Sequence, residues 1–393
     1  AGPTRAPART SPAPWGTTSA VTPFDVAGLT GPVPRHCAGR HPRPMSISDS
    51  HAPTLPIAPT VLRAADLSSE PPPESVPILR GVRFLPTPGL DPWGQMREAT
   101  LARIIAIHRT CPSVEAFSHE SAALLHGADT DQAEPDIHTI CGAKASRTSA
   151  PLPCLDYGDP RRRARQGRAG PCHEVYHRRH RLALPPNEKT MALGIPVTTI
   201  PRTIADCLLD LPGQSALVVC DSLLRIAAQA DRFHRERSER AAARVLAEVE
   251  PIIRRAGGRR RRRRALRMLP LLNPLVESPP ESRLRFELLR MGTPVPVVQM
   301  HFVAGGRHYY ADLGWPWVRL GWEYDGQGKY AHPEAVLNEK RRSERAEDIG
   351  IKLLRAGSAD LRAPEALLAR TLRHLPAGTE PGSFPITPRP WMA

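Results

Sequence analysis

The amino-acid sequence predicts an α/β protein whose most regular part is a three-layer core over residues 275–375. Three strand-like segments follow one another at residues 294–326, and a long charged helix, an apolar strand and a last helix come after them. A helix at residues 278–292 precedes the strands. The order α-β-β-β-α-β-α places helices on both faces of one sheet, which defines the fold class.

Local signals mark the ends of these elements. Ser278 and the two prolines that follow it suit the first turn of a helix. The pair at 305–306, both glycines, predicts a hairpin turn between the first two strands, and Pro316 a turn between the second and third. Gly350 ends the charged helix.

Composition limits what surrounds this core. The chain of 393 residues has room for two or three domains, and its 45 prolines predict a disordered, Pro/Arg-rich tail at residues 1–75. Residues 376–393 are expected to be a second flexible tail. The formal net charge of +15 comes mostly from arginine. This excess is either a trait of a GC-rich genome or a phosphate-binding surface.

The cysteine count and hydropathy predict a cytoplasmic protein without membrane contact. Seven cysteines form no C-x-x-C pair, so a disulfide framework is not expected and a reducing compartment is. No apolar run approaches the roughly 18–20 residues that a membrane helix needs. The N-terminus also lacks the apolar core of a signal peptide.

Residues 76–130 predict a winged helix-turn-helix. The segment at 76–85 would be a short strand or wing, and residues 97–110 repeat apolar side chains at helical spacing. The segment FSHESAALLHG would be a second helix, capped by Ser118 and ended by Gly127. An ordinary helical pair within a core is the alternative.

Residues 131–230 predict a mixed α+β domain of short strands followed by two apolar-faced helices. One strand region holds four residue types that bind metals, namely Cys172, His173, His177 and His180. Because strand side chains alternate, these four fall on both faces and cannot converge without a bend. We therefore interpret the region as a polar, partly exposed strand.

Residues 231–274 predict a basic helical linker. It contains the strongest charge run of the chain, Arg259, Arg260, Arg261, Arg262, Arg263 and Arg264. Such a run is usually a solvated linker or helix face. The alternative is a non-specific nucleic-acid contact with strongly salt-dependent binding.

Acidic side chains gather in the strands of the C-terminal core. Glu323 and Asp325 lie two residues apart in one strand and so share a face. Asp312 precedes Glu323 by about the length of a strand, a turn and a returning strand. Three carboxylates on adjacent strands would suit Mg²⁺ or Mn²⁺. The alternative is that Asp312 only ends a strand and that Asp325 only begins a turn.

The same segments resemble known families. ESPPESRLR, ADLGWP, WEYDGQGKY, EKRR and IGIKLLR are similar to the PD-(D/E)XK restriction-endonuclease-like fold, and in particular to actinobacterial domains of unknown function that look like very-short-patch-repair endonucleases. Upstream, FSHESAALLHG, GIPVTTIPRTIADC and ALVVCDSLLR resemble AbiEi-type type IV antitoxins or transcriptional regulators. Together the resemblances cover about residues 77–375.

The nuclease resemblance implies a metal centre with named ligands. Asp312 and Glu323 would hold Mg²⁺ or Mn²⁺, and Glu281 would reach the same end from the preceding helix. Glu281 could instead cap that helix or form a salt bridge. The Lys of the E-x-K motif is replaced by Asp325, so the sequence departs from the motif at a catalytic position.

A basic residue that steadies the attacking water would then come from elsewhere. Lys329 and Lys340 are the candidates that the resemblance offers for this role. Arg341 and Arg342 follow Lys340 on the predicted charged helix and are candidates for DNA contact. A solvated helix face formed by Glu339, Lys340 and Arg342 is the alternative.

Two functions follow from these observations. The first is a Mg²⁺-dependent DNA endonuclease or nickase, in which the upstream region selects DNA. The second is a non-catalytic, antitoxin-like DNA-binding regulator with a degenerate nuclease fold, which would have a toxin as its neighbour protein. An RNA- or protein-binding module fits less well, since the sequence lacks the aromatic pattern of an RNA-recognition motif.

Overall fold

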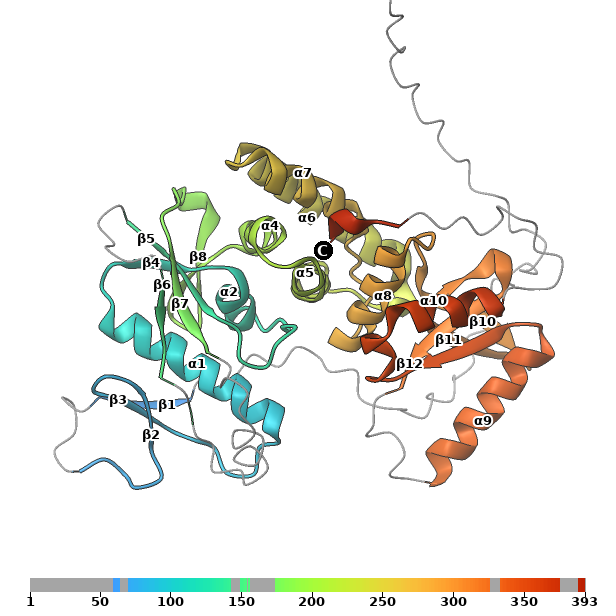
Figure 1. Ribbon diagram of the computed structural model, residues 1–393, viewed down its shortest axis with the longest axis horizontal. Helices are drawn as coiled ribbons and strands as arrows, with labels where there is room; N and C mark the ends of the chain where they lie inside the picture. The colour runs from blue at the N-terminus through green and yellow to red at the C-terminus, as the bar shows by residue number, and fades with distance from the viewer. Residues whose placement is uncertain are drawn as a thin grey trace, which may run out of the picture. The chain divides into compact units, whose positions relative to one another are not determined.

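The computed structural model describes residues 59–63, 70–142, 149–153, 155, 174–325, 333–374 and 388–392, excluding the side chains of 333–339. Within these ranges the chain is an α/β protein, as predicted. Its strands form a three-stranded, a six-stranded and a four-stranded sheet (Figure 1). No helix among the described residues is long and apolar enough to cross a membrane.

A small antiparallel sheet precedes the first helix. Its strands, in the order β1-β3-β2, are β1 (Thr60–Arg63), β2 (Val76–Leu79) and β3 (Val82–Leu85). Helix α1 (Pro92–Thr110) begins after the N-cap Asp91, whose carboxylate accepts the N–H of Gly94. Ala102 and Ala106 pack against the small sheet, while Leu101 and Ile104 pack against the six-stranded sheet. Helix α1 therefore lies between two cores.

The six-stranded sheet has the order β6-β7-β5-β4-β9-β8. Its strands are β4 (Val114–Phe117), β5 (Ile137–Cys141), β6 (Ser149–Pro151), β7 (Tyr176–His180), β8 (Lys189–Ala192) and β9 (Ile195–Thr198). Strand β5 runs parallel to β7 and antiparallel to β4. Every residue of β5 is buried, as expected for a strand inside a sheet.

The predicted helix-turn-helix at residues 76–130 is wrong. Strand β4 separates α1 from α2 (His119–Leu125) and pairs with β5 and β9 in the sheet. All seven residues of α2 are buried. A recognition helix must expose one face to a DNA groove, and α2 has none to offer. Its run of small and apolar residues fills a core instead, which was the alternative interpretation.

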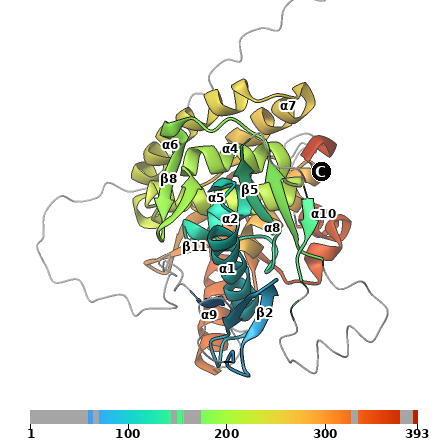
Figure 2. The ribbon, with the colours of Figure 1, turned by 90° about the vertical axis from the view of Figure 1, so that its left-hand side faces the viewer.

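Four helices follow the sheet, and they lie side by side in Figure 2. They are α4 (Ile200–Asp210), α5 (Gly213–Ala228), α6 (Arg235–Arg255) and α7 (Arg259–Met268). The predicted linker at residues 231–274 is thus incorrect, because α6 and α7 share one core with α4 and α5. Val249, Ile253 and Met268 are fully buried in it. Among its many charged residues, this segment carries apolar side chains at helical spacing, and these form the buried stripe.

The C-terminal domain has the predicted order of elements. Its parts are α8 (Pro279–Met291), β10 (Val297–Ala304), β11 (Arg307–Trp315), β12 (Leu320–Tyr324), α9 (Pro333–Asp348), β13 (Lys352–Ala356) and α10 (Pro364–Arg373). The sheet order is β10-β11-β12-β13, antiparallel except for the parallel β12–β13 pair. Helices α8 and α10 cover one face and α9 the other (Figure 1).

Helix α8 connects two cores. Leu284 and Leu288 pack with the C-terminal sheet, whereas Phe286 and Leu289 pack with the α4–α7 helices. Between these helices, Arg285 donates two hydrogen bonds to Asp221 of α5, at 2.7 and 2.6 Å. Both side chains of this ion pair are 1% exposed. The pair therefore joins α5 to α8 in a dry environment.

Candidate functional site

Asp312 and Glu323 lie where strands β11 and β12 diverge. Their pairing ends with Leu313 opposite Trp322, so the two acids stand one residue further along each strand. There, Oδ2 of Asp312 accepts the backbone N–H of Tyr324 at 2.7 Å. The carboxylate of Asp312 thus accepts a backbone N–H of β12 just beyond the last backbone pair of the two strands. Glu323 is buried, at 7% exposure. The structure brings these two predicted residues together.

Glu281 approaches the same edge from α8. Its carboxylate accepts the Oγ–H of the N-cap Ser278 at 2.8 Å and the N–H of Glu277 at 3.0 Å. Burial, and then the negative charge of Asp312, raise the pKa of Glu281 to about 8. Glu281 therefore both caps its helix and faces Asp312, which combines the two interpretations of this residue.

Arginines, rather than lysines, accompany the acids. An Nη atom of Arg342 on α9 lies 2.6 Å from Oε1 of Glu323 and also donates to the carbonyl of Tyr310. Asp325, which stands where the motif has Lys, lies 3.8 Å from Arg355 of β13. The guanidinium of Arg342 thus lies beside the acids, the place for which the resemblance offered Lys329 or Lys340.

The other predicted basic residues lie elsewhere. The amino group of Lys340 is 3.9 Å from Glu344, and its side chain is 74% exposed. Arg341 is also exposed. Both residues lie on the solvated face of α9. For Lys340 this agrees with the alternative interpretation, whereas Arg342, which that interpretation also placed in solvent, pairs with Glu323. Lys329 lies outside the described residues.

A strained residue of β10 stands opposite Asp312 in the strand register, and its side-chain oxygen accepts a hydrogen bond from Arg232 at 3.1 Å. Gln299 stands between the pairs Val298–Leu313 and Met300–Ala311, opposite Asp312. Its φ of 49° is in the left-handed region, although its side chain is only 1% exposed. Such strain in a non-glycine residue is typical of functional sites.

The arginine run on α7 divides into two groups. Arg261 pairs with Asp210, Arg262 donates to the carbonyl of Ala256, and Arg264 donates to carbonyls at the end of α4. These three arginines serve the fold. The other three are exposed and free to attract a polyanion, namely Arg259, Arg260 and Arg263.

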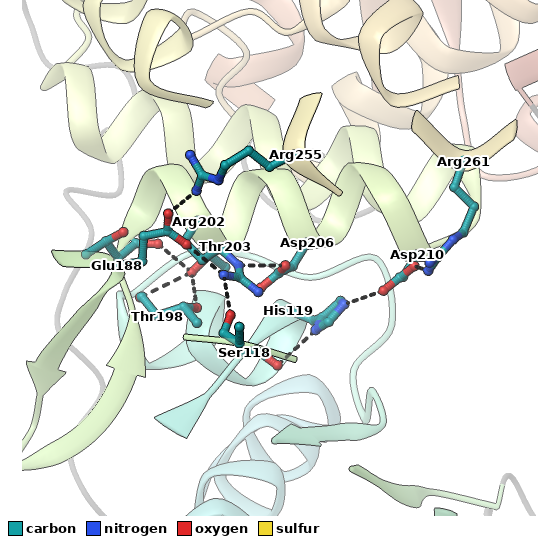
Figure 3. Close-up of polar contacts among 12 residues, drawn as sticks. Ser118, His119, Glu188, Thr198, Arg202, Thr203, Asp206, Asp210, Arg255 and Arg261 are labelled. Atoms are coloured by element: carbon teal, nitrogen blue, oxygen red, sulfur yellow. Dashed lines mark hydrogen bonds and ion pairs between the residues drawn. The ribbon is translucent and has the colours of Figure 1, made fainter. Parts of the chain in front are cut away.

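A second polar cluster lies in the six-stranded sheet. His119 begins α2 with a φ of 50° and is fully buried. Its Nδ1 lies 2.9 Å from the Oγ of Ser118 and its Nε2 lies 3.2 Å from Oδ2 of Asp210 (Figure 3). On the far side of the carboxylate, Asp210 binds Arg261 of α7. A series of polar contacts therefore connects the start of α2 to helix α7.

Two more histidines complete this cluster. His138 on β5 and His180 on β7 approach with Nδ1 and Nε2 at 2.9 Å. The ring of His119 lies 4.6 Å from that of His138 and 4.4 Å from that of His180, between centroids. Among the described residues, this trio is the one group of three or more His, Cys, Asp or Glu whose ligand atoms lie within 4.8 Å of one another. The acids of the C-terminal edge do not form such a group.

The sequence interpretation placed His180 with the wrong neighbours. It weighed His180 together with His177, but His177 points the other way and contacts Thr139 Oγ1 at 2.9 Å. Cys172 and His173 lie outside the described residues. The missed partners, His119 and His138, stand in apolar segments. A histidine inside a fully buried strand such as DIHTI requires a polar partner. This requirement is the sequence signal that could have identified His138 as part of a polar cluster.

Comparison with known proteins adds relatives but no activity. No family model and no solved structure matches the chain. Two uncharacterized proteins of Mycobacterium tuberculosis, from strains CDC 1551 and H37Rv, are each 31% identical over 166 residues. The match covers 42% of this chain and 60% of each relative. The chain thus spans less than two thirds of the relatives' length, and their names carry no function.

Proposed function

We propose that this chain binds DNA and that its C-terminal domain is an endonuclease-like centre for metal-dependent phosphodiester hydrolysis. The observation that carries the proposal is the meeting of Asp312, Glu323 and Glu281 at one end of the sheet. Two of these carboxylates come from diverging strands and one from a helix N-terminus. Burial, and then the charge of Asp312, raise the pKa of Glu281 to about 8, so Glu281 keeps its proton at neutral pH unless a cation displaces it.

The donor atoms of these residues are of the type that a hard divalent cation prefers, and the three carboxylates would have to move closer together to share one ion. Carboxylate oxygens are the ligands that Mg²⁺ and Mn²⁺ prefer, and such an ion would offset the charge that Asp312 and Glu281 share. Asp312, Glu323 and Glu281 would hold it. When bound, it would polarise a phosphate oxygen and lower the pKa of a water molecule.

The residues around the acids suit a phosphodiester. Arg342 holds the Glu323 carboxylate, and its planar guanidinium can also donate to phosphate oxygens. The exposed arginines of α7 would supply the sequence-independent attraction that holds DNA to the chain. In this proposal Arg342 takes the part that the missing lysine plays in the motif.

Plasmid nicking tests the proposal directly. The purified full chain should convert supercoiled plasmid to nicked or linear forms with Mg²⁺ or Mn²⁺, and EDTA should stop the reaction. Asp312→Ala and Glu323→Gln should each slow it by about 10³-fold, since metal catalysis supplies several kcal/mol. Glu344→Gln, an exposed acid on α9, should cut at the wild-type rate. Absent cleavage, or equal cleavage by the two site variants, contradicts an active centre.

One observation favours a second candidate function. The Arg342 guanidinium is already paired with Glu323, and Asp325 replaces the motif lysine. A centre arranged in this way could retain the fold and have lost cleavage, leaving a DNA-binding regulator of the antitoxin type. This candidate predicts metal-independent binding to the chain's own upstream DNA, tighter than to random DNA and weakened by salt. A nucleotidyltransferase-like toxin gene beside its own would also support it.

A further inference from the structure

We infer that His119, His138 and His180 form a binding site for a divalent transition-metal ion, with Zn²⁺ the foremost candidate. This site lies in the six-stranded sheet and does not depend on the proposed nuclease centre. The sheet brings two of the ligands together. In the parallel β5–β7 pair, His138 is opposite Arg178, so His180, two residues on, projects from the same face. The start of α2 adds His119 from the neighbouring β4.

Two of the three ligand nitrogens already converge as ligands would. Nδ1 of His138 and Nε2 of His180 are 2.9 Å apart, which requires one proton shared between two lone pairs. A metal ion would accept both lone pairs in place of that one proton, which would leave to solvent.

Asp210 fixes how His119 would bind. Oδ2 of Asp210 lies 3.2 Å from Nε2 of His119, while Arg261 pairs with Oδ1 of the same carboxylate. An ionised carboxylate only accepts, so Nε2 of His119 carries the proton and Nδ1 presents its lone pair. At present the Ser118 hydroxyl meets that lone pair at 2.9 Å. A carboxylate behind a ligand histidine is a common arrangement in zinc sites, and here it makes Asp210 a positioning residue.

The electrostatics of the cluster allow a cation. The two guanidinium groups that depress the pKa of His180 are each paired with a carboxylate, Arg261 with Asp210 and Arg178 with Asp136. Their positive charge is therefore largely offset. Three imidazole nitrogens select Zn²⁺, Co²⁺, Ni²⁺ or Cu²⁺ over Mg²⁺. The left-handed backbone of buried His119 is a strain that a packing role alone does not require.

Co²⁺ titration of the EDTA-treated full chain tests this site. The background should carry His301→Asn and His308→Asn, because this exposed pair, with nitrogens 2.9 Å apart, could bind metal adventitiously. We expect one equivalent of Co²⁺ with visible d–d absorption, displaced by Zn²⁺ and unaffected by millimolar Mg²⁺. His180→Asn should weaken binding by at least about 100-fold, and Asp210→Asn by about 10–100-fold with the absorption bands retained.

His177→Asn is the matched control, because His177 is a buried histidine of the same strand that faces Thr139 instead. It should bind Co²⁺ like the background protein. Circular dichroism of each metal-free variant checks folding, and His180, the least buried ligand, carries the test if His138→Asn does not fold. No saturable Co²⁺ binding, or His180→Asn binding as tightly as His177→Asn, overturns the site and leaves a stacked, uncharged packing cluster.

Discussion

The carboxylate edge of the C-terminal sheet and the histidine trio of the six-stranded sheet bring polar side chains of neighbouring strands together in opposite ways. At the first, Asp312 and Glu323 come from consecutive antiparallel strands that a short turn joins. At the second, His138 and His180 come from parallel strands, which need a long connection between them. A site built on a hairpin can therefore be predicted from the sequence spacing of its residues, whereas a site built on neighbouring parallel strands cannot.

The two regions also treat charge differently. At the carboxylate edge, burial and then the charge of Asp312 raise the pKa of Glu281 to about 8, so this acid is protonated at neutral pH. In the trio, the pKa values of His138 and His180 fall, so the rings stay neutral while the nearby charged groups pair with one another. Hard oxygen donors and neutral nitrogen donors should therefore select different metals.

The largest expected effect is a reciprocal loss of metal responses. Glu323→Gln should reduce Mn²⁺-dependent cleavage by about 10³-fold while leaving Co²⁺ absorption at the trio unaltered. His180→Asn should remove the Co²⁺ absorption and leave Mn²⁺-dependent cleavage within a factor of about two. Cleavage assays and Co²⁺ titrations on the same preparations measure both. If one substitution abolishes both responses, the two regions do not bind metal independently, which contradicts this prediction.

A large effect on stability should come from the ion pair between the two regions. Arg285→Met leaves the buried Asp221 without its guanidinium and should destabilise the chain by about 3–5 kcal/mol. Thermal unfolding monitored by circular dichroism would measure the change as a lower apparent Tm. Adding Asp221→Leu should recover much of it, because the uncompensated charge is then gone. A double variant less stable than the single one would contradict this reason.

The smallest expected effect is on the salt dependence of DNA binding, and it comes from arginines that belong to neither site. Replacing the exposed α7 arginines, Arg259, Arg260 and Arg263, by Gln should reduce the slope of log K against log salt by up to about 0.9 for each DNA phosphate that these arginines neutralise. The same change at three exposed arginines of α6, Arg237, Arg240 and Arg244, controls for net charge. Fluorescence anisotropy with duplex DNA at several salt concentrations gives both slopes. Equal slopes would show that α7 makes no particular contact with DNA.

The C-terminal domain could be predicted because its signals are local. Ser278 caps α8, Gly305 and Gly306 turn the chain between β10 and β11, and Gly350, at φ 73°, follows the end of α9. The alternation of side chains fixes the register that sets Asp312 beside Glu323. Each of these signals acts within a few residues, so the element order and the strand pairing were confirmed.

In the upstream half, predictions failed where burial in the folded chain decides the role of a segment and its local sequence pattern does not. The segment around Ser118 has the periodicity of a helix, but burial on all sides makes α2 a core element instead of a recognition helix. The arginine-rich segment has the composition of a linker, yet Val249 and Ile253 bury one stripe of α6 among other helices. Charge content describes the exposed face of such a helix and says nothing of the face that packs.

The sequence by itself determined the α/β class, the order of the C-terminal elements and the acids at the β11–β12 divergence. Backbone sterics and side-chain alternation act over short distances along the chain, so these features follow from local residue types. Only the tertiary structure decided that His119, His138 and His180 meet, that Asp210 supports them and that Arg342 reaches Glu323. These contacts depend on which strands become neighbours and which helix covers them, and packing of the whole core settles that choice.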